Sequence, residues 1–306
     1  MDLEPVERYR PLVDDWDAFV EAARRPLPTT VWTNHLRTTP SELEEWFCRA
    51  ETEFDAVEWY DGAYRLPDVA SPGNRVEYMA GLYHVQEEAS LIPPVLLAAQ
   101  PDERVLDLCA APGNKTAQLA VDMRNRGTVV ANDRDTNRLR AVRRVLDRLG
   151  LLNVSVINHD GTNLPSEIGR FDAVLVDVPC SCEGNTRKSP NALSTPAEEF
   201  APKVAGTQEA LLRRGLQLCR PGGRVVYSTC TYAPEENERI VDRALEAVGS
   251  ETDRIAPARI DGLHVSRGLL GWRGDEFRED MENAMRVWPH QNDTGGFFVA
   301  VIERGA

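Results

Sequence analysis

Two cysteines stand in short polar motifs that each follow a hydrophobic stretch. Cys180 lies in Asp177-Val-Pro-Cys-Ser-Cys, and Cys230 lies in Tyr227-Ser-Thr-Cys-Thr-Tyr. A thiolate is a good nucleophile, and a second acid or base beside it helps to complete a covalent reaction. Two thiols at the ends of neighbouring strands therefore indicate covalent chemistry on an electron-poor ring. We predict that the chain is an enzyme.

The remaining four cysteines carry weaker signals. Free cysteines are often buried as small apolar side chains, which is what we expect of Cys48, Cys109 and Cys219. Cys182 is in CxC spacing with Cys180, a weak metal signal by itself, and we leave it outside the predicted site. Because the sequence contains no CxxC pair and no His/Cys cluster, it predicts no disulfide framework, no metal site and a reducing, cytoplasmic compartment.

A second motif has the features of a cofactor loop. In Leu108-Cys-Ala-Ala-Pro-Gly-Asn-Lys-Thr, Gly113 allows the backbone to approach a ligand closely at the start of a helix. The motif is not GxGxxG, which disfavours a nicotinamide cofactor. Asp133 and Asp160 end the next two predicted strands, and Asp133 has the spacing expected of a ribose-binding acid. The alternative is that Asp133 and Asp135 cap the next helix and that Asp160 begins a turn.

The charge of the chain is strongly acidic. Its 306 residues carry 49 acids against 35 bases, a net charge of -14, and its lysines are Lys115, Lys188 and Lys203. Such a composition is typical of proteins that work in concentrated salt, so we expect a halophilic, haloarchaeal source. An acidic mesophile with a GC-rich genome is the alternative. The negative charge argues against bulk attraction to nucleic acid, so any RNA contact must be local. We find no export signal and no membrane-spanning run.

The pattern of strands and helices predicts two domains. From about Gln86 onward, strands alternate with helices, which predicts a Rossmann-like α/β domain with a mostly parallel sheet over residues 86–306. The strands are expected at 104–109, 128–132, 154–157, 171–176, 224–228 and 297–302, and the helices at 115–123, 137–149 and 211–219.

Residues 1–85 read as a small α+β subdomain. We predict a strand at 30–37, edge strands at 56–60 and 63–66, and a helix at 39–48 whose capping box is formed by Ser41 and Glu44. The turn-rich segment 67–74 marks the end of this subdomain.

Several motifs together resemble a known family. The motifs Cys109-Ala-Ala-Pro-Gly-Asn-Lys-Thr, Asp177-Val-Pro-Cys-Ser, Ser228-Thr-Cys-Thr and Arg286-Val-Trp-Pro-His with Gly295-Gly-Phe-Phe occur in the order of the Sun-type (NSUN) RNA cytosine-5 methyltransferases. The N-terminal segment is similar, more loosely, to the RNA-recognition-like subdomain of that family. The chain departs from the pattern at Asn114, Val178 and 182–184, which affects loop geometry more than chemistry.

The resemblance implies an S-adenosylmethionine-dependent enzyme that methylates cytosine in structured RNA. We favour tRNA over rRNA as the substrate and expect a monomer. The resemblance also implies Cys230 as the nucleophile, Cys180 as the group that assists release, and Asp177 and Lys115 as polar partners of the ring. The expected cofactor residues are Cys109, Ala110, Ala111, Pro112, Gly113, Asn114, Lys115, Asp133, Arg138, Asp160 and Asp177.

Other residues are candidates for the surroundings of the site. The resemblance places Gln86, Glu87 and Ser90 in the lining of the cofactor pocket. Arg187 and Lys188 either contact phosphates or form a solvated basic turn, whereas Trp288 and His290 are expected to be structural.

Two alternatives to RNA methylation stay open at this point. One is a methyltransferase for another substrate whose thiols are incidental. The other is a catalytically silent RNA-binding assembly factor that keeps the cofactor fold.

Overall fold

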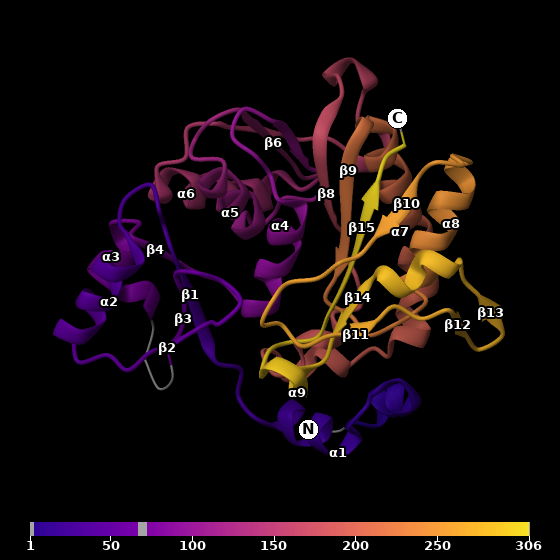
Figure 1. Cartoon of the computed structure of the whole chain (residues 1–306), viewed down its shortest axis with the longest axis horizontal. Coiled ribbons are helices and arrows are strands. Elements are labelled where there is room, and N and C mark those ends of the chain that lie inside the picture. The colour runs from indigo at the N-terminus through magenta and orange to yellow at the C-terminus, as the bar shows by residue number, and fades with distance from the viewer. Residues whose placement is uncertain (1–2, 67–71, 306) are drawn as a thin grey trace.

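The computed structural model describes residues 3–66 and 72–305. A large sheet lies at the centre of the molecule with helices on both faces, and a small sheet lies at one side (Figure 1). Most of the turn-rich segment predicted at 67–74 falls outside the described residues. The prediction of an α/β domain preceded by a small α+β subdomain is confirmed.

The large sheet combines a parallel half with an antiparallel half. Its order is β11-β14-β15-β9-β8-β5-β6-β7, with β10 paired to β15. The parallel strands are β5 (Arg104–Asp107), β6 (Thr128–Asn132), β7 (Val154–Ile157), β8 (Phe171–Asp177) and β9 (Cys219–Thr229). The antiparallel strands are β10 (Arg254–Ala256), β11 (Ser266–Arg267), β14 (Met285–Val287) and β15 (Phe297–Glu303). The runs predicted at 128–132 and 154–157 match β6 and β7 to the residue.

Helices cover the two faces of this sheet and bury a separate apolar core on each. One face carries α4 (Ile92–Leu97), α5 (Asn114–Asp122) and α6 (Thr136–Leu149), and the other carries α7 (Ala197–Leu218) and α8 (Glu238–Val248) (Figure 1). In α6 the buried stripe of Leu139, Val142, Leu146 and Leu149 follows the predicted helical period. Helix α7 begins well before the predicted residue 211 and contains Pro202.

The small sheet has the order β2-β3-β1-β4 and is antiparallel. Its strands are β1 (Thr29–Thr33), β2 (Asp55–Ala56), β3 (Ala63–Leu66) and β4 (Tyr83–Val85), and α2 (Pro40–Arg49) packs on it. The strand predicted at 56–60 is wrong, because after Ala56 the chain makes a turn. The capping box is formed by Thr39 and Glu42 rather than by Ser41 and Glu44, since Pro40 occupies the first helical turn.

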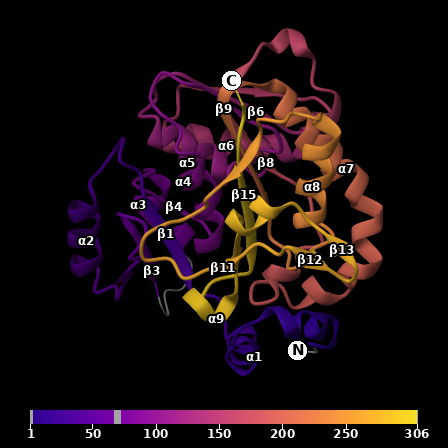
Figure 2. The ribbon, with the colours of Figure 1, turned by 45° about the vertical axis from the view of Figure 1, so that its right-hand side comes forward.

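The first residues of the chain lie apart from the small sheet. The segment η1 (Glu4–Leu12) and helix α1 (Trp16–Arg24) pack against α9 (Pro289–Asn292) and the large domain, which both views show (Figures 1 and 2). Phe19, Tyr232 and Trp288 join there in one apolar cluster. The N-terminal segment therefore belongs physically to the large domain.

The remaining elements are short. They are η2 (Pro72–Asn74), α3 (Val76–Met79), η3 (Glu88–Leu91), η4 (Gly161–Asn163), η5 (Ser166–Ile168), η6 (Glu183–Asn185), η7 (Pro190–Leu193), β12 (Gly271–Trp272), β13 (Asp275–Glu276) and η8 (Glu279–Asn283). Among the described helices, none combines the length and the apolar character needed to cross a bilayer.

The acidic composition leads to a prediction about salt. With a net charge of -14, the folded chain repels itself, and salt screens that repulsion. We expect the unfolding midpoint to rise by about 5 °C or more between about 0.1 M and about 3 M KCl, as measured by circular dichroism. A midpoint that is highest near zero salt would instead identify an ordinary acidic mesophile.

Candidate active site

Three loops meet where the strand order of the large sheet reverses. Strand β5 lies between β6 and β8, so the segments after β5 and β8 diverge at their carboxyl ends and leave room for a ligand. The cofactor-like motif follows β5, the Cys180 segment follows β8, and the Cys230 segment follows β9. Sequence reasoning expected this convergence because parallel strands end at the same edge.

The two motif cysteines face one another. The Sγ atoms of Cys180 and Cys230 lie 3.4 Å apart, and the Sγ of Cys182 lies 3.9 Å from that of Cys180. The side chain of Asn185 donates a hydrogen bond of 3.1 Å to the Cys230 sulfur. All three cysteines line a cavity of about 330 Å³. The thiols are thus close to one another and open to a ligand.

A half-buried ion pair lies in the same cavity. The Nζ of Lys115 contacts Oδ2 of Asp177 at 2.7 Å, and the Ser228 hydroxyl donates to Oδ1 of the same carboxylate at 2.7 Å. Burial alone lowers the pKa of Lys115, but the charge of Asp177 and its hydrogen bond outweigh burial and raise that pKa. Lys115 also lies 5.4 Å from the centre of the Phe297 ring. A fixed cation therefore faces the space in front of Cys230.

The loop after β5 forms much of the cavity wall. The predicted cofactor residues that line the cavity are Cys109, Ala110, Ala111, Pro112, Asn114, Lys115, Arg138 and Asp177. Gly113 is not among these lining residues and is needed for the backbone conformation. Its φ is +110°, and a Cβ there would lie 2.9 Å from Cα of Val142 in α6. Only glycine fits this close helix-to-loop contact without strain.

A smaller hollow of about 50 Å³ continues this space. Its lining includes Asp133, Asp160 and Arg134, and it shares Cys109, Arg138 and Pro179 with the larger cavity. The two spaces therefore adjoin each other at the carboxyl edge of the sheet, and together we call them the groove.

The acidic residues of this groove differ in their hydrogen-bond partners within the protein. Asp133 accepts hydrogen bonds from the amides of Ala111, at 3.2 Å, and Asp135, at 2.9 Å. Asp135 is the residue that caps α6. Asp160 caps its own turn through Thr162, as its alternative interpretation held, while also lining the hollow.

Comparisons with known proteins place this geometry in a family. A family model described as 16S rRNA methyltransferase RsmB/F matches residues 94–303, and one described as the N-terminal domain of 16S rRNA methyltransferase RsmF matches residues 5–88. The chain belongs to the RsmB/F methyltransferase family. The resemblance to Sun-type enzymes is thereby confirmed.

Individual relatives of this RsmB/F chain agree with the family model. It is 33% identical to a tRNA (cytosine(49)-C(5))-methyltransferase of Pyrococcus abyssi, over 98% of this chain and 95% of the relative. It is 34% identical to a 28S rRNA (cytosine-C(5))-methyltransferase of Mus musculus, over 94% of this chain and 36% of the relative. A crystal structure of a methyltransferase homolog protein from Pyrococcus horikoshii matches with a TM-score of 0.82 and 31% identity, over 99% and 100% of the two chains. The chain spans less than two thirds of the length of the first curated relatives it matches.

The structure corrects one expectation for this RsmB/F chain and refines others. Arg187 neither grips phosphates nor forms a solvated turn: its side chain is 1% exposed and bonds Asp293 and the carbonyls of Arg25, Pro26 and Thr294. Lys188 is exposed and lines the cavity. Glu87 and Ser90 also line it, whereas Gln86 bonds to Trp32 and Gln118 behind the wall.

Several residues that line the cavity were missed by sequence reasoning, among them Cys182, which it left outside the predicted site. Asp107 lines it, and burial raises the pKa of this carboxyl to about 7. Its place at the end of β5, before the cofactor-like motif, was the available signal. Asn185 and Phe297 also line the cavity; Phe297 lies in the Gly295-Gly-Phe-Phe motif, whereas no sequence pattern pointed to Asn185.

Buried glutamates hold the two cysteine loops of this RsmB/F chain in place. Glu183 accepts hydrogen bonds from the Tyr9 hydroxyl at 2.6 Å and the Ala197 amide at 2.9 Å, and burial raises its pKa to about 7. Glu236 accepts from the Ser181 amide at 3.0 Å and from Gln208 at 2.9 Å.

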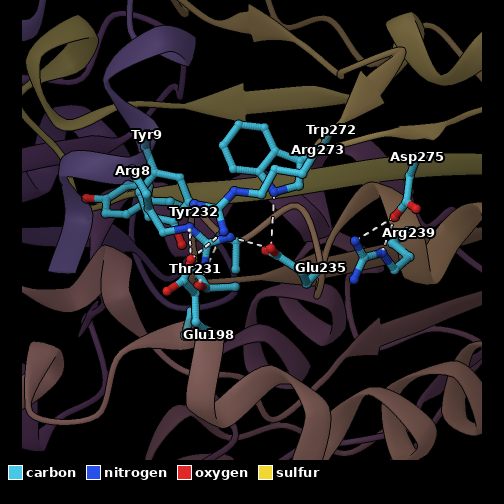
Figure 3. Close-up of polar contacts among 12 residues, drawn as sticks. Arg8, Tyr9, Glu198, Thr231, Tyr232, Glu235, Arg239, Trp272, Arg273 and Asp275 are labelled. Atoms are coloured by element: carbon cyan, nitrogen blue, oxygen red, sulfur yellow. Dashed lines mark hydrogen bonds and ion pairs between the residues drawn. The ribbon is translucent and has the colours of Figure 1, made fainter.

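The N-terminal segment completes this support. Arg8 pairs with Glu235, which also accepts a 3.1 Å hydrogen bond from Trp272, and Arg8 and Tyr9 lie beside Thr231 and Tyr232, directly after Cys230 (Figure 3). Residues from three distant parts of the chain thus fix the loop that carries Cys230.

We expect Tyr9→Phe to destabilise the protein by about 1–3 kcal/mol, because it removes a donor from a fully buried carboxylate but keeps the ring. Urea unfolding measures this. Tyr64→Phe is the control, since the Tyr64 hydroxyl donates to a half-buried glutamate, Glu44, and a smaller loss is expected there. Equal losses in the two variants would contradict the supporting role of Tyr9.

Proposed function

We propose that the protein methylates C5 of cytosine in RNA, with S-adenosylmethionine as the methyl donor. The observation that carries this proposal is the pair of thiols, 3.4 Å apart, in a cavity whose wall includes the cofactor-type loop. Incidental thiols would have no reason to face one another beside a half-buried Lys115–Asp177 pair. The named activities of the relatives from Pyrococcus abyssi and Mus musculus agree with it.

The groove suits S-adenosylmethionine in its chemistry. Asp133 at its narrow end is 4% exposed and offers a carboxylate for ribose hydroxyl groups, and the Cys109–Asn114 loop surrounds its middle. When bound, the cofactor supplies a methyl group on a positively charged sulfur. Asp177 lines the same cavity and would provide negative charge near that sulfur.

Different residues of the cavity carry out the other steps of the reaction. Cytosine C5 is too weak a nucleophile to accept a methyl group directly, so the Cys230 thiolate first adds to C6 and makes C5 electron-rich. Lys115 and Asp177, held together at 2.7 Å, stabilise the polar edge of the ring during this addition. After methylation the C5 proton leaves to a base, and the bond from C6 to sulfur breaks. Cys180 is the acid or base placed to assist that release.

We favour tRNA as the substrate over rRNA. The relative from Pyrococcus abyssi, named for cytosine 49 of tRNA, is nearly the same length as this chain, whereas the chain spans only about a third of the Mus musculus rRNA enzyme.

The proposal is tested by supplying radiolabelled S-adenosylmethionine with unmodified tRNA or rRNA transcripts. Nuclease digestion and chromatography then identify the labelled nucleoside. We expect 5-methylcytidine, with faster transfer to tRNA. Label in another nucleoside or in protein, or no transfer at all in a folded protein that binds the cofactor, would overturn the proposal; faster transfer to rRNA would reverse only the choice of RNA.

A variant of Asp133 tests the cofactor assignment. We expect Asp133→Ala to weaken S-adenosylmethionine binding by about 1–3 kcal/mol, measured by calorimetry, because a hydrogen bond to a charged group is lost. Asp135→Ala is the control, since Asp135 caps α6 through the amides of Asn137 and Arg138. If the affinity of Asp133→Ala for the cofactor is unchanged, Asp133 does not bind the cofactor and its role is structural.

A further inference from the structure

The third thiol, Cys182, has no part in the proposed methyl transfer, yet it lies beside the two that do. The Sγ atoms of Cys180, Cys182 and Cys230 all lie within 4.8 Å of one another. Within residues 3–66 and 72–305, they form the one group of three or more His, Cys, Asp or Glu ligand atoms gathered closely enough to hold a metal ion. The CxC spacing alone was a weak signal, because the third sulfur comes from a different strand end.

The spacing of the sulfurs matches a metal site. Sulfurs bound about 2.3 Å from a zinc ion at tetrahedral angles lie about 3.8 Å from one another. The observed separations are 3.4 Å between Cys180 and Cys230 and 3.9 Å between Cys180 and Cys182. The thiols therefore need only small side-chain adjustments to bind one ion.

The backbone conformation of Cys182 is a second indication that its side chain has a function. Cys182 adopts φ +61°, a left-handed conformation in which glycine is unstrained and most other residues are disfavoured. Strain of this kind costs of order 1–3 kcal/mol and is typical of functional positions. Here it directs the sulfur back toward Cys180, whose carbonyl oxygen lies 3.3 Å from it.

The surroundings suit three thiolates around a cation. Asn185 already donates a hydrogen bond to the Cys230 sulfur, and the Lys115 ammonium lines the same cavity. A divalent ion with three thiolates carries one net negative charge, which both groups stabilise. The cavity also leaves space for water in a fourth position, the arrangement that zinc adopts at open sites.

We propose that Cys180, Cys182 and Cys230 form a binding site for a thiophilic cation of the Zn²⁺ class, and that the bound ion blocks methyl transfer. One ion and one water bind as three S–H groups release three protons to solvent, which leaves a three-thiolate complex of charge -1. The ion is bound to the sulfur of Cys230, so this thiolate cannot add to cytosine. The inhibitory part of this inference rests on the proposed function, whereas the binding part does not.

Metal titration of the reduced protein tests the binding part without RNA or cofactor. We expect the wild type to take one equivalent of Zn²⁺ from the chelator 4-(2-pyridylazo)resorcinol. Cys182→Gly, which suits the left-handed backbone, and Cys182→Ser should each bind at least about tenfold more weakly. Cys48→Ser is the matched control, because Cys48 is exposed on α2 and should not affect binding. Wild-type affinity no greater than that of the Cys182 variants, or a loss in Cys48→Ser, would overturn the site.

Cobalt gives a reading that needs no variant. Co²⁺ bound by thiolates produces a strong sulfur-to-metal absorption band, so a titration of the wild type reports the ligands directly. A Co²⁺ complex without that band would contradict a thiolate site.

The inhibitory part is tested with labelled methyl transfer in buffered Zn²⁺. We express each rate relative to the zinc-free rate of the same protein. The zinc concentration that halves this rate should be at least about tenfold higher in Cys182→Gly than in the wild type. Zinc that binds the wild type without slowing transfer would overturn the inhibition. If neither the wild type nor the variant transfers methyl groups even without zinc, the proposed function is wrong. The metal titration still shows whether the three thiols bind the ion.

Discussion

Replacing Cys180 with alanine is expected to trap RNA on the protein. Cys230 can still add to C6 of cytosine in this variant, but the group placed to assist release, 3.4 Å from its sulfur, is gone. A covalent protein–RNA complex that survives denaturing electrophoresis should therefore accumulate, and turnover should fall by about 10²–10⁴-fold. Cys230→Ala should form no such complex, because it lacks the nucleophile.

The two variants must be compared with a cysteine that lies elsewhere. Cys219 is fully buried at the start of β9, and Cys48 is exposed on α2, so Cys48→Ala is the cleaner control and should turn over without accumulating a complex. A trapped complex in Cys230→Ala but not in Cys180→Ala would reverse the two roles. No complex in either variant would refute covalent catalysis.

The positions of the strand ends could be predicted because local sequence determines them. The β-branched runs that became β6 and β7 were assigned correctly, and the residues that follow each strand could then be placed at one edge of the sheet. Asp177 ends β8, Cys180 follows β8, and Cys230 follows β9, so their convergence needed only the order of the strands. This part of the site is a consequence of topology.

What could not be predicted depends on contacts between residues far apart in the chain. Arg187 looked like a basic surface residue, yet it is buried by acceptors from segments around 25 and 293. Nothing in the sequence singled out Glu183, yet its carboxylate accepts a hydrogen bond from the hydroxyl of Tyr9, 174 positions earlier. The third sulfur of the cysteine cluster depended on a left-handed backbone at Cys182, which sequence patterns do not specify for a cysteine.

Asp177→Asn isolates the contribution of one charge to catalysis. Both carboxylate oxygens of Asp177 are engaged, one by Lys115 and the other by Ser228. An asparagine can keep its oxygen toward Lys115 and turn its amino group toward the Ser228 oxygen, so the shape of the site is preserved. The variant therefore removes the negative charge that keeps the pKa of Lys115 raised. We expect methyl transfer to fall by at least about 100-fold, as measured in a single turnover.

Ser228→Ala is the matched control for this variant, because it removes one hydrogen bond from Asp177 and leaves its charge. The rate of methyl transfer in Ser228→Ala should fall about tenfold, which corresponds to about 1–1.5 kcal/mol for one hydrogen bond. Equal losses in Ser228→Ala and Asp177→Asn would mean that the orientation of the carboxylate, rather than its charge, is what catalysis needs.

The step that Asp177 serves can be separated in the background of the trapped complex. Asp177 lines the same cavity as the cofactor-type loop, so its loss could act on cofactor binding or on the ring. If the carboxylate acts on the ring, Cys180→Ala with Asp177→Asn will accumulate the covalent complex far more slowly than Cys180→Ala alone, even at saturating cofactor. If saturating cofactor restores the rate, the carboxylate acts through cofactor binding. The second result would leave Lys115 as the only charged partner of the ring, with no counter-ion role for Asp177 in the addition step.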